Sequence, residues 1–110
     1  MRNVRELGDF EQLVVLAVIR LGDDAYGITI TAEIEDRTGF RISRGAVYTT
    51  LNRLENKGFL SSYLGEPLPV RGGRSRRYYR VEPEGLEALQ TMRVALERMW
   101  KGLEPELGRL

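Results

Sequence analysis

The sequence predicts a mainly α-helical fold with one small β-hairpin, and three observations lead to this prediction. Residues 43–58 have the apolar spacing of a helix that buries one face. Residues 59–81 have the pattern of two strands joined by a Gly-Gly tip that arginines surround. Residues 83–103 carry apolar side chains at heptad spacing. A helix followed by a basic hairpin is the layout of a winged helix-turn-helix, so we expect that fold with a C-terminal helix added.

The composition fits one ordinary globular domain with one small core. The chain has 110 residues, of which 42% are hydrophobic and 30% are charged. It has no cysteine and no histidine, which excludes disulfides and zinc fingers and removes the commonest general base. No nucleophile–base pair or phosphate loop is present, so we expect no catalytic residues, no metal and no cofactor. The longest apolar run, residues 13–19, is too short to span a membrane, and without a signal peptide a cytoplasmic protein is expected.

Positive charge is concentrated in the middle of the chain. Residues 41–80 hold nine Arg and Lys against two Glu, whereas the formal net charge of the whole chain is only +1. The other residues are therefore net negative, and the near-neutral total conceals a basic face. Such a face is the electrostatic signature of a protein that binds a phosphate backbone.

The first helix is expected to follow an N-terminal tail of eight residues. Asp9 fits the N-cap position, with Gln12 at N3 in a capping-box pattern. Apolar side chains follow on a helical stripe at Phe10, Leu13, Val14, Ala17, Val18 and Leu21, and off it at Val15, Leu16 and Ile19. A helix that is apolar nearly all round is buried on two sides, and the second side is expected to contact a partner chain. The β-branched residues leave a buried strand as the competing interpretation, but the cap and Gly22 favour a helix.

A helix-turn-helix is expected next. A turn at residues 22–24 leads into a second helix over residues 26–38, which Gly39 ends, and Tyr26 is expected to pack against the third helix. Ser43 then fits the N-cap of the third helix, and Gly58 ends it by permitting a positive φ. The buried face of this third helix is expected to consist of Val47, Leu51 and Leu54.

The hairpin and the last helix complete the predicted elements. Strands are expected at residues 59–66 and 76–81, with Pro67 and Pro69 ending the first of them. Tyr78 and Tyr79 should point to opposite faces of the second strand, so that one of them joins the core. The last helix is expected over residues 83–103, with a heptad seam at Leu89, Met92, Leu96, Met99 and Leu103.

Three segments, in this order and spacing, resemble the PadR family of bacterial transcriptional regulators. They are Y-G at residues 26–27, G-A-V-Y-T-T-L-N-R-L-E-N-K-G-F-L at residues 45–60, and G-G-R-S-R-R-Y-Y-R-V at residues 72–81, followed by E-P-E-G-L. The chain departs from the family at Glu82, where a threonine is typical. The resemblance implies a winged helix-turn-helix DNA-binding domain at residues 1–82 and, as in the small subfamily, a C-terminal dimerisation helix at residues 83–110, in one compact unit. It implies a sequence-specific regulator, expected to be a dimeric repressor of an inverted-repeat operator in double-stranded DNA.

The candidate DNA-binding residues come from the third helix and the hairpin. The face of the third helix opposite Val47, Leu51 and Leu54 is polar and free of acids, and the competing interpretation is an ordinary solvated face. For the arginines at the hairpin the competing interpretation is a flexible, soluble loop. The expected DNA contacts are Arg44, Gly45, Tyr48, Thr49, Asn52 and Arg53 from the helix, and Arg71, Arg74, Arg76 and Arg77 from the hairpin.

A dimer interface is expected at Leu13, Leu16, Leu89, Met92, Leu96, Met99 and Leu103. Trp100 lies beside this seam, and two interpretations of it stay open. One is packing in the dimer. The other follows from the resemblance, because some PadR-like regulators hold planar aromatic ligands next to a tryptophan, and it makes a small aromatic effector a candidate partner. A winged-helix module that binds protein rather than DNA is the alternative function, although such a module would not need a basic hairpin.

Overall fold

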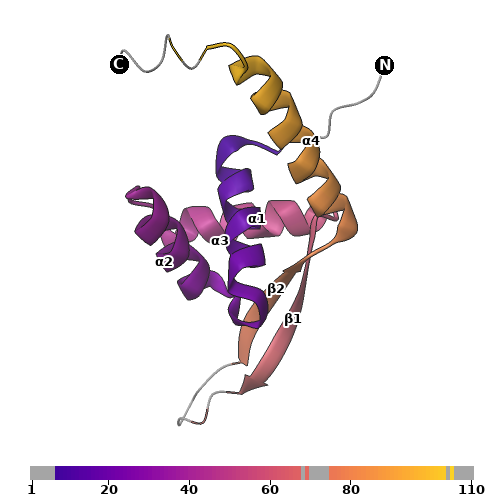
Figure 1. Cartoon of the computed structure of the whole chain (residues 1–110). Helices are drawn as coiled ribbons and strands as arrows, with labels where there is room; N and C mark the ends of the chain where they lie inside the picture. Colours follow the sequence, from indigo (N-terminus) through magenta and orange to yellow (C-terminus); the bar gives the residue numbers. More distant parts are fainter. Residues whose placement is uncertain (1–6, 68, 70–74, 104, 106–110) are drawn as a thin grey trace.

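The structure is a computed structural model that describes residues 7–67, 69, 75–103 and 105. Its elements, shown in Figure 1, are α1 (Asp9–Leu21), the short 3-10 turn η1 (Gly22–Asp24), α2 (Gly27–Thr38), α3 (Arg44–Asn56), β1 (Leu60–Pro67), β2 (Ser75–Val81) and α4 (Pro83–Trp100). The prediction of a mainly helical fold with one hairpin is confirmed, and residues 9–21 form a helix rather than a strand.

The start of α1 differs from the prediction. The N-cap is Gly8, whose N–H donates to Glu11 Oε1 at 2.8 Å, so the assignment of Asp9 as the cap was wrong by one residue. Leu7, which the sequence placed in a tail, is only 2% exposed and belongs to the core. The burial of Leu7 just before the helix fixes the position at which the helix begins. The sequence around Leu7 does not indicate that this side chain is buried.

The core lies between α1, α2, α3 and one face of the hairpin. Its fully buried side chains include Val14, Val15, Ile30, Val47, Leu51, Leu54, Phe59 and Leu60. The buried face predicted for the third helix is therefore confirmed. By contrast, Leu16 and Ile19 are 43% and 45% exposed, so α1 leaves its second apolar side uncovered within one chain.

The turns around α3 form as the sequence predicts. Gly39 adopts a φ of 75° at the end of α2, and Gly58 adopts 79° after α3. Ser43 Oγ accepts a hydrogen bond from the Ala46 N–H at 3.1 Å. These local features define where α2 ends and where α3 begins and ends.

The hairpin is antiparallel, and the turn before α2 pairs with its second strand. Ser62 pairs with Tyr79 and Tyr63 with Tyr78. The Tyr79 N–H donates to the Ala25 carbonyl at 2.9 Å, and Tyr26 forms a bridge with Tyr78. The hairpin is thus tied at its base to the helix-turn-helix, and beyond that base it projects from the body of the molecule (Figure 1).

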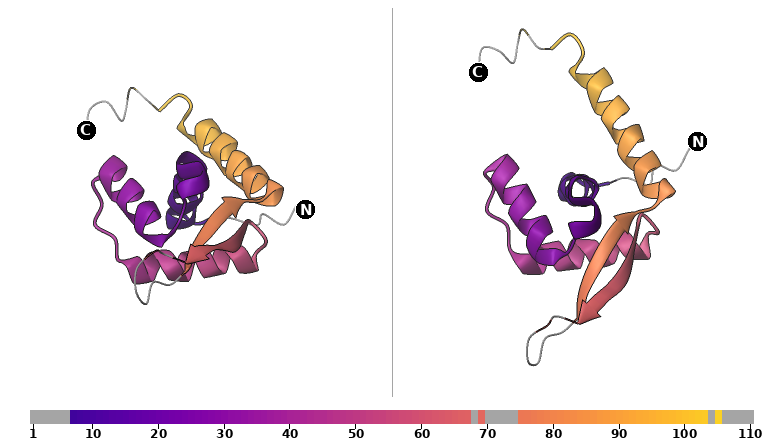
Figure 2. Two further views of the ribbon diagram at one scale, coloured as in Figure 1. Left: turned by 90° about the horizontal axis from the view of Figure 1, so that it is seen from below. Right: turned by 60° about the horizontal axis from the view of Figure 1, so that its bottom comes forward.

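Helix α4 ends at Trp100, so Leu103 lies beyond the helix that was expected to include it. Its first turn lies against the segment that follows α3, because the Glu82 N–H donates to the Phe59 carbonyl at 2.9 Å. A Cβ at Gly85 would collide with that same carbonyl. Figure 2 shows α3 and α4 on opposite sides of α1. No helix among the described residues is long and apolar enough to cross a membrane.

Candidate nucleic-acid interface

Helix α3 presents a polar face to solvent. All six of its predicted DNA-contacting residues are exposed, namely Arg44, Gly45, Tyr48, Thr49, Asn52 and Arg53. The opposite face is anchored by Val47, Leu51 and Leu54, each 0% exposed. Helix α3 itself lies on the other side of α1 from α4 (Figure 2).

One face of the hairpin carries a chain of aromatic and cationic contacts. The Tyr63 and Tyr78 rings stack with centroids 5.6 Å apart, and Tyr26 meets Tyr78 edge-on at 5.5 Å. The guanidinium of Arg76 lies 4.5 Å from the Tyr26 centroid, and that of Arg80 lies 4.7 Å from the Tyr63 centroid. Tyr26 therefore makes its ring contacts with β2, where the sequence suggested packing on the third helix. Each such cation–π contact contributes about 0.5–1 kcal/mol at an exposed site, so together they stiffen the hairpin.

The other face of the hairpin is bonded to α3. The Ser62 hydroxyl donates to Glu55 Oε2 at 2.6 Å, and Arg77 Nη1 donates to Ser62 Oγ at 2.9 Å. The exposed residues of α3 include no acid, as predicted, and Glu55 is half-buried at the edge of the helix. Neither Glu55 nor Ser62 was singled out from the sequence, because the link between them depends on the tertiary contact of α3 with β1.

The β-hairpin is the wing of the winged helix-turn-helix, and the arginines predicted to bind DNA there do not form one patch within the described residues. Arg76 is half-buried on the aromatic face, whereas Arg77 is exposed on the face that meets α3, as strand alternation requires. Arg71 and Arg74 lie outside the described residues. Tyr79 is the tyrosine that joins the core, at 4% exposure. Burial, followed by the nearby Glu55 carboxylate, raises the pKa of the Tyr79 hydroxyl, which therefore stays protonated at neutral pH.

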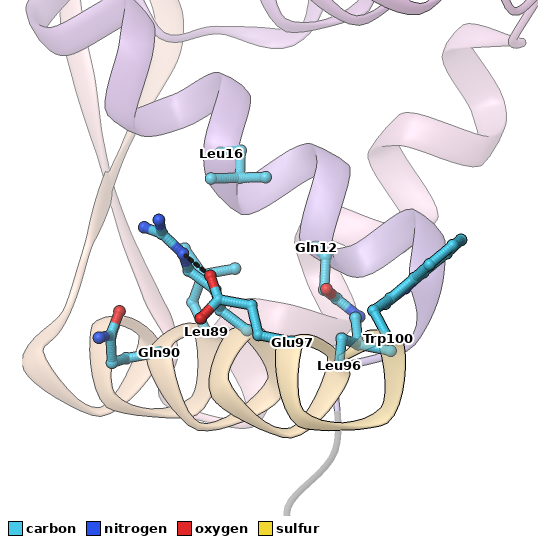
Figure 3. A pocket seen from close by; sticks show the side chains of 8 residues that line it. Gln12, Leu16, Leu89, Gln90, Leu96, Glu97 and Trp100 are labelled. Atoms are coloured by element: carbon cyan, nitrogen blue, oxygen red, sulfur yellow. Dashed lines mark hydrogen bonds and ion pairs between the residues drawn. The ribbon is translucent and has the colours of Figure 1, made fainter. Parts of the chain in front are cut away.

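A groove of about 350 Å³ runs between α1 and α4. Figure 3 shows Leu16 of α1 facing α4, with Gln90 and Trp100 toward opposite ends of the lining. The side chains that line the groove are Gln12, Leu16, Leu89, Gln90, Arg93, Leu96, Glu97 and Trp100. The groove is thus lined by three residues predicted for the dimer interface, Leu16, Leu89 and Leu96, and by Trp100, which was predicted to contact a ligand.

The remaining predicted interface residues differ in exposure. Leu13 packs against the core, and Met92 is half-buried. Met99 and Leu103 are 75% and 48% exposed, and Trp100 is 52% exposed. An apolar surface therefore continues along α4 past the groove. Within the described residues, no group of three or more carboxylates could hold a metal ion.

Comparison with known proteins adds a family and several structural neighbours. The model of the PadR-like transcriptional regulator family matches residues 15–91. Transcriptional regulator Rv3488 of Mycobacterium tuberculosis is 42% identical over 77 residues, which are 70% of this chain and 67% of that protein. A PadR family transcription regulator from Clostridium difficile R20291 superposes with a TM-score of 0.75 at 27% identity, over 91% of this chain and 99% of that one. A transcriptional regulator from Clostridium thermocellum gives a TM-score of 0.71 at 28% identity, over 86% of each chain.

Proposed function

This chain belongs to the PadR-like family of transcriptional regulators, and from that premise we propose that it is a homodimeric repressor of an inverted-repeat operator. Binding to DNA follows from the family. The proposal adds that the protein is a dimer, that it represses transcription, that its operator is symmetric and that a ligand releases it from DNA. The observation that carries it is the separation of two surfaces, a polar α3 face on one side of α1 and an apolar α4 surface on the other.

The first surface suits the major groove of DNA. Recognition helices of this architecture contact base edges with their N-terminal residues. In α3 these residues are Arg44, Tyr48 and Thr49, and Asn52 and Arg53 follow toward the flanking phosphates. We expect the hairpin to contact the adjacent DNA backbone, and Arg77 lies on its face that meets α3. Phosphate contacts fix the position of the protein, whereas the helix reads the sequence.

The second surface suits a second copy of the chain. Leu16, Ile19, Leu96 and Met99 are between 42% and 75% exposed, and burying one such side chain fully contributes about 1.5–3 kcal/mol. Several must be buried together, because association also loses translational and rotational freedom. A two-fold dimer through α1 and α4 would hold two α3 helices at a fixed separation. Its half-sites are then expected about one helical turn, or ~10 base pairs, apart.

The groove beside Trp100 suits a small aromatic effector. A ligand there would contact α1 and α4 at once, so it would favour one spacing of these helices over another. Only such differential affinity can shift a conformational equilibrium. Coupling of about 1–3 kcal/mol would change DNA affinity by roughly five- to 150-fold.

The test uses the DNA upstream of the gene that encodes this chain. Footprinting with purified protein is expected to protect an imperfect inverted repeat, and sedimentation is expected to show a dimer at micromolar concentration. Transcription from that promoter in vitro should fall as protein is added. A monomer in sedimentation, or protection of one isolated half-site, would contradict the proposal.

A further inference from the structure

Glu55 is the only carboxylate on α3, and it occupies a helix that otherwise suits a polyanion. A negative charge near bound phosphates would weaken binding by repulsion unless a hydrogen-bond donor or a cation offsets it. Its Oε2 atom accepts a hydrogen bond from Ser62 Oγ at 2.6 Å. Glu55 is half-buried and directed at the first strand of the hairpin, so it links the recognition helix to the wing.

The hydrogen bonding at Ser62 has a fixed direction. A serine hydroxyl has one proton and two lone pairs. Because the proton is given to Glu55, the oxygen accepts the hydrogen bond from Arg77 Nη1 at 2.9 Å. The guanidinium has five N–H donors in a rigid plane, and one of them is held by Ser62. Arg77 is exposed, so its outer edge is available to a phosphate.

The backbone around Ser62 is also fixed. Ser62 pairs across the hairpin with Tyr79, which is buried, and the next pair on the same face of the hairpin is Leu64 with Arg77. Ser62 therefore lies where the hairpin contacts the core, and Arg77 lies two pairs further toward the tip. The hydroxyl connects the part of the wing that is packed to the part that extends beyond the body.

We propose that Ser62 is a positioning residue for DNA binding, whose hydroxyl holds Arg77 of the wing in register with Glu55 of the recognition helix. This inference rests on the proposed function, because it assumes that α3 and the wing contact one duplex. The helix and the wing arginine then approach DNA as one preformed unit. Without the hydroxyl, Arg77 would have to be ordered during binding. Ordering one long side chain at an interface lowers affinity by about two- to tenfold.

The experiment compares Ser62→Ala with Ser62→Thr and Arg77→Ala in the full chain. The probe is a labelled duplex from the DNA upstream of the gene, titrated at several salt concentrations. Ser62→Ala is expected to weaken binding by about two- to tenfold with the salt slope unchanged, because Arg77 still reaches its phosphate in the complex. Ser62→Thr keeps a hydroxyl on a strand residue and should restore the affinity. Arg77→Ala should reduce the salt slope by about one unit.

Two controls separate positioning from packing. Ser61→Ala makes the same change one residue earlier, on the opposite face of β1, and should leave affinity unchanged. Ser62→Ala added to Arg77→Ala should cause no further loss, because residues that act through one another are not additive. A packing role would instead add to the effect of Arg77→Ala on DNA affinity.

The outcomes distinguish this inference from the function on which it rests. Wild-type affinity in Ser62→Ala, beside a weakened Arg77→Ala, would overturn the positioning role and leave DNA binding by the wing intact. Equal losses in Ser62→Ala and Ser62→Thr would overturn it as well. If the wild type bound the upstream duplex no better than a scrambled duplex, the proposed function itself would fail.

Discussion

The ring of Tyr48 lies so close to the backbone of Gly27 that any side chain at residue 27 would collide with it. Gly27 is the first residue of α2, and Tyr48 lies on the exposed side of α3. The two helices of the helix-turn-helix therefore make close contact at a position that also belongs to the candidate DNA surface. The Y-G pair at residues 26–27 gains a physical explanation, because only glycine leaves room for the ring.

Gly27→Ala is expected to push Tyr48 away and to destabilise the protein by about 1–3 kcal/mol, as overpacking generally does. Gly45→Ala is the matched control. A Cβ at Gly45 has open space, with its nearest neighbour 4.0 Å away, and alanine favours a helix by about 0.5–1 kcal/mol over glycine. Urea unfolding should therefore shift in opposite directions for the two variants. Equal stability of Gly27→Ala and the wild type would show that the ring moves aside freely.

The dimer prediction is tested at Leu96, which lies on the apolar surface of α4 and is 42% exposed in the single chain. Leu96→Lys would bury an unpaired charge in the interface, which is strongly unfavourable. Sedimentation is expected to show monomers at concentrations where the wild type is dimeric, and DNA affinity should fall with it. Thr91→Lys places the same charge on an exposed site outside the seam and should remain dimeric. A dimeric Leu96→Lys protein would exclude this face as the interface.

The local pattern was sufficient for the elements of the helix-turn-helix. The spacing of Val47, Leu51 and Leu54 predicts a buried helical face, and Gly39 and Gly58 end their helices by a backbone conformation that favours glycine. These features depend on neighbours within one helical turn, so the sequence displays them directly.

Features that depend on tertiary contacts were missed. Leu7 enters the core although it precedes the first helix, and this burial moves the cap to Gly8. The alternation of a strand places Tyr78 and Tyr79 on opposite faces without saying which face is buried. The link from Glu55 to Ser62 joins two elements whose relative position no local pattern defines.

The pH dependence of stability is tested at Glu11, a buried carboxylate. Burial alone would raise the pKa of Glu11, but the hydrogen bond from Gly8 and the ion pair with Lys57 at 2.9 Å outweigh it, so the pKa is lowered. Because the pKa of Glu11 is lower in the folded state, the charged carboxylate stabilises the fold at pH values above the pKa of the unfolded state, about 4.3. This stabilisation is lost as the pH falls through the pKa of the folded state. Glu11→Gln should therefore be less stable near neutral pH, by about 1–2 kcal/mol. Chemical unfolding from pH 7 to pH 3 should show the two proteins converging, and a constant difference would contradict this role.

Thr49 and Arg53, both exposed on α3, are expected to contact a base and a phosphate respectively, and two substitutions test this difference. Thr49→Ala is expected to change the preferred base at one operator position, where a direct contact is worth about 1–3 kcal/mol. Arg53→Ala should instead weaken binding to all duplexes alike and reduce the salt slope by about one unit. Binding to a set of single-base operator variants at several salt concentrations separates the two effects. A uniform loss with Thr49→Ala would move that residue to the phosphates.

The effector hypothesis is tested at Trp100, the only tryptophan in the chain. Its ring is half exposed at the groove between α1 and α4, so planar aromatic compounds that enter the groove should quench its fluorescence and weaken operator binding. The same compounds should release the operator from Trp100→Phe less effectively and from Trp100→Ala not at all, because stacking area falls in that order. Both variants should bind the operator as dimers when no compound is present, since the tryptophan lies beside the apolar seam. If Trp100→Ala fails to dimerise, the ring belongs to the interface. If no compound in a panel of neutral and cationic aromatics quenches the fluorescence of the wild type, the groove is not an effector site.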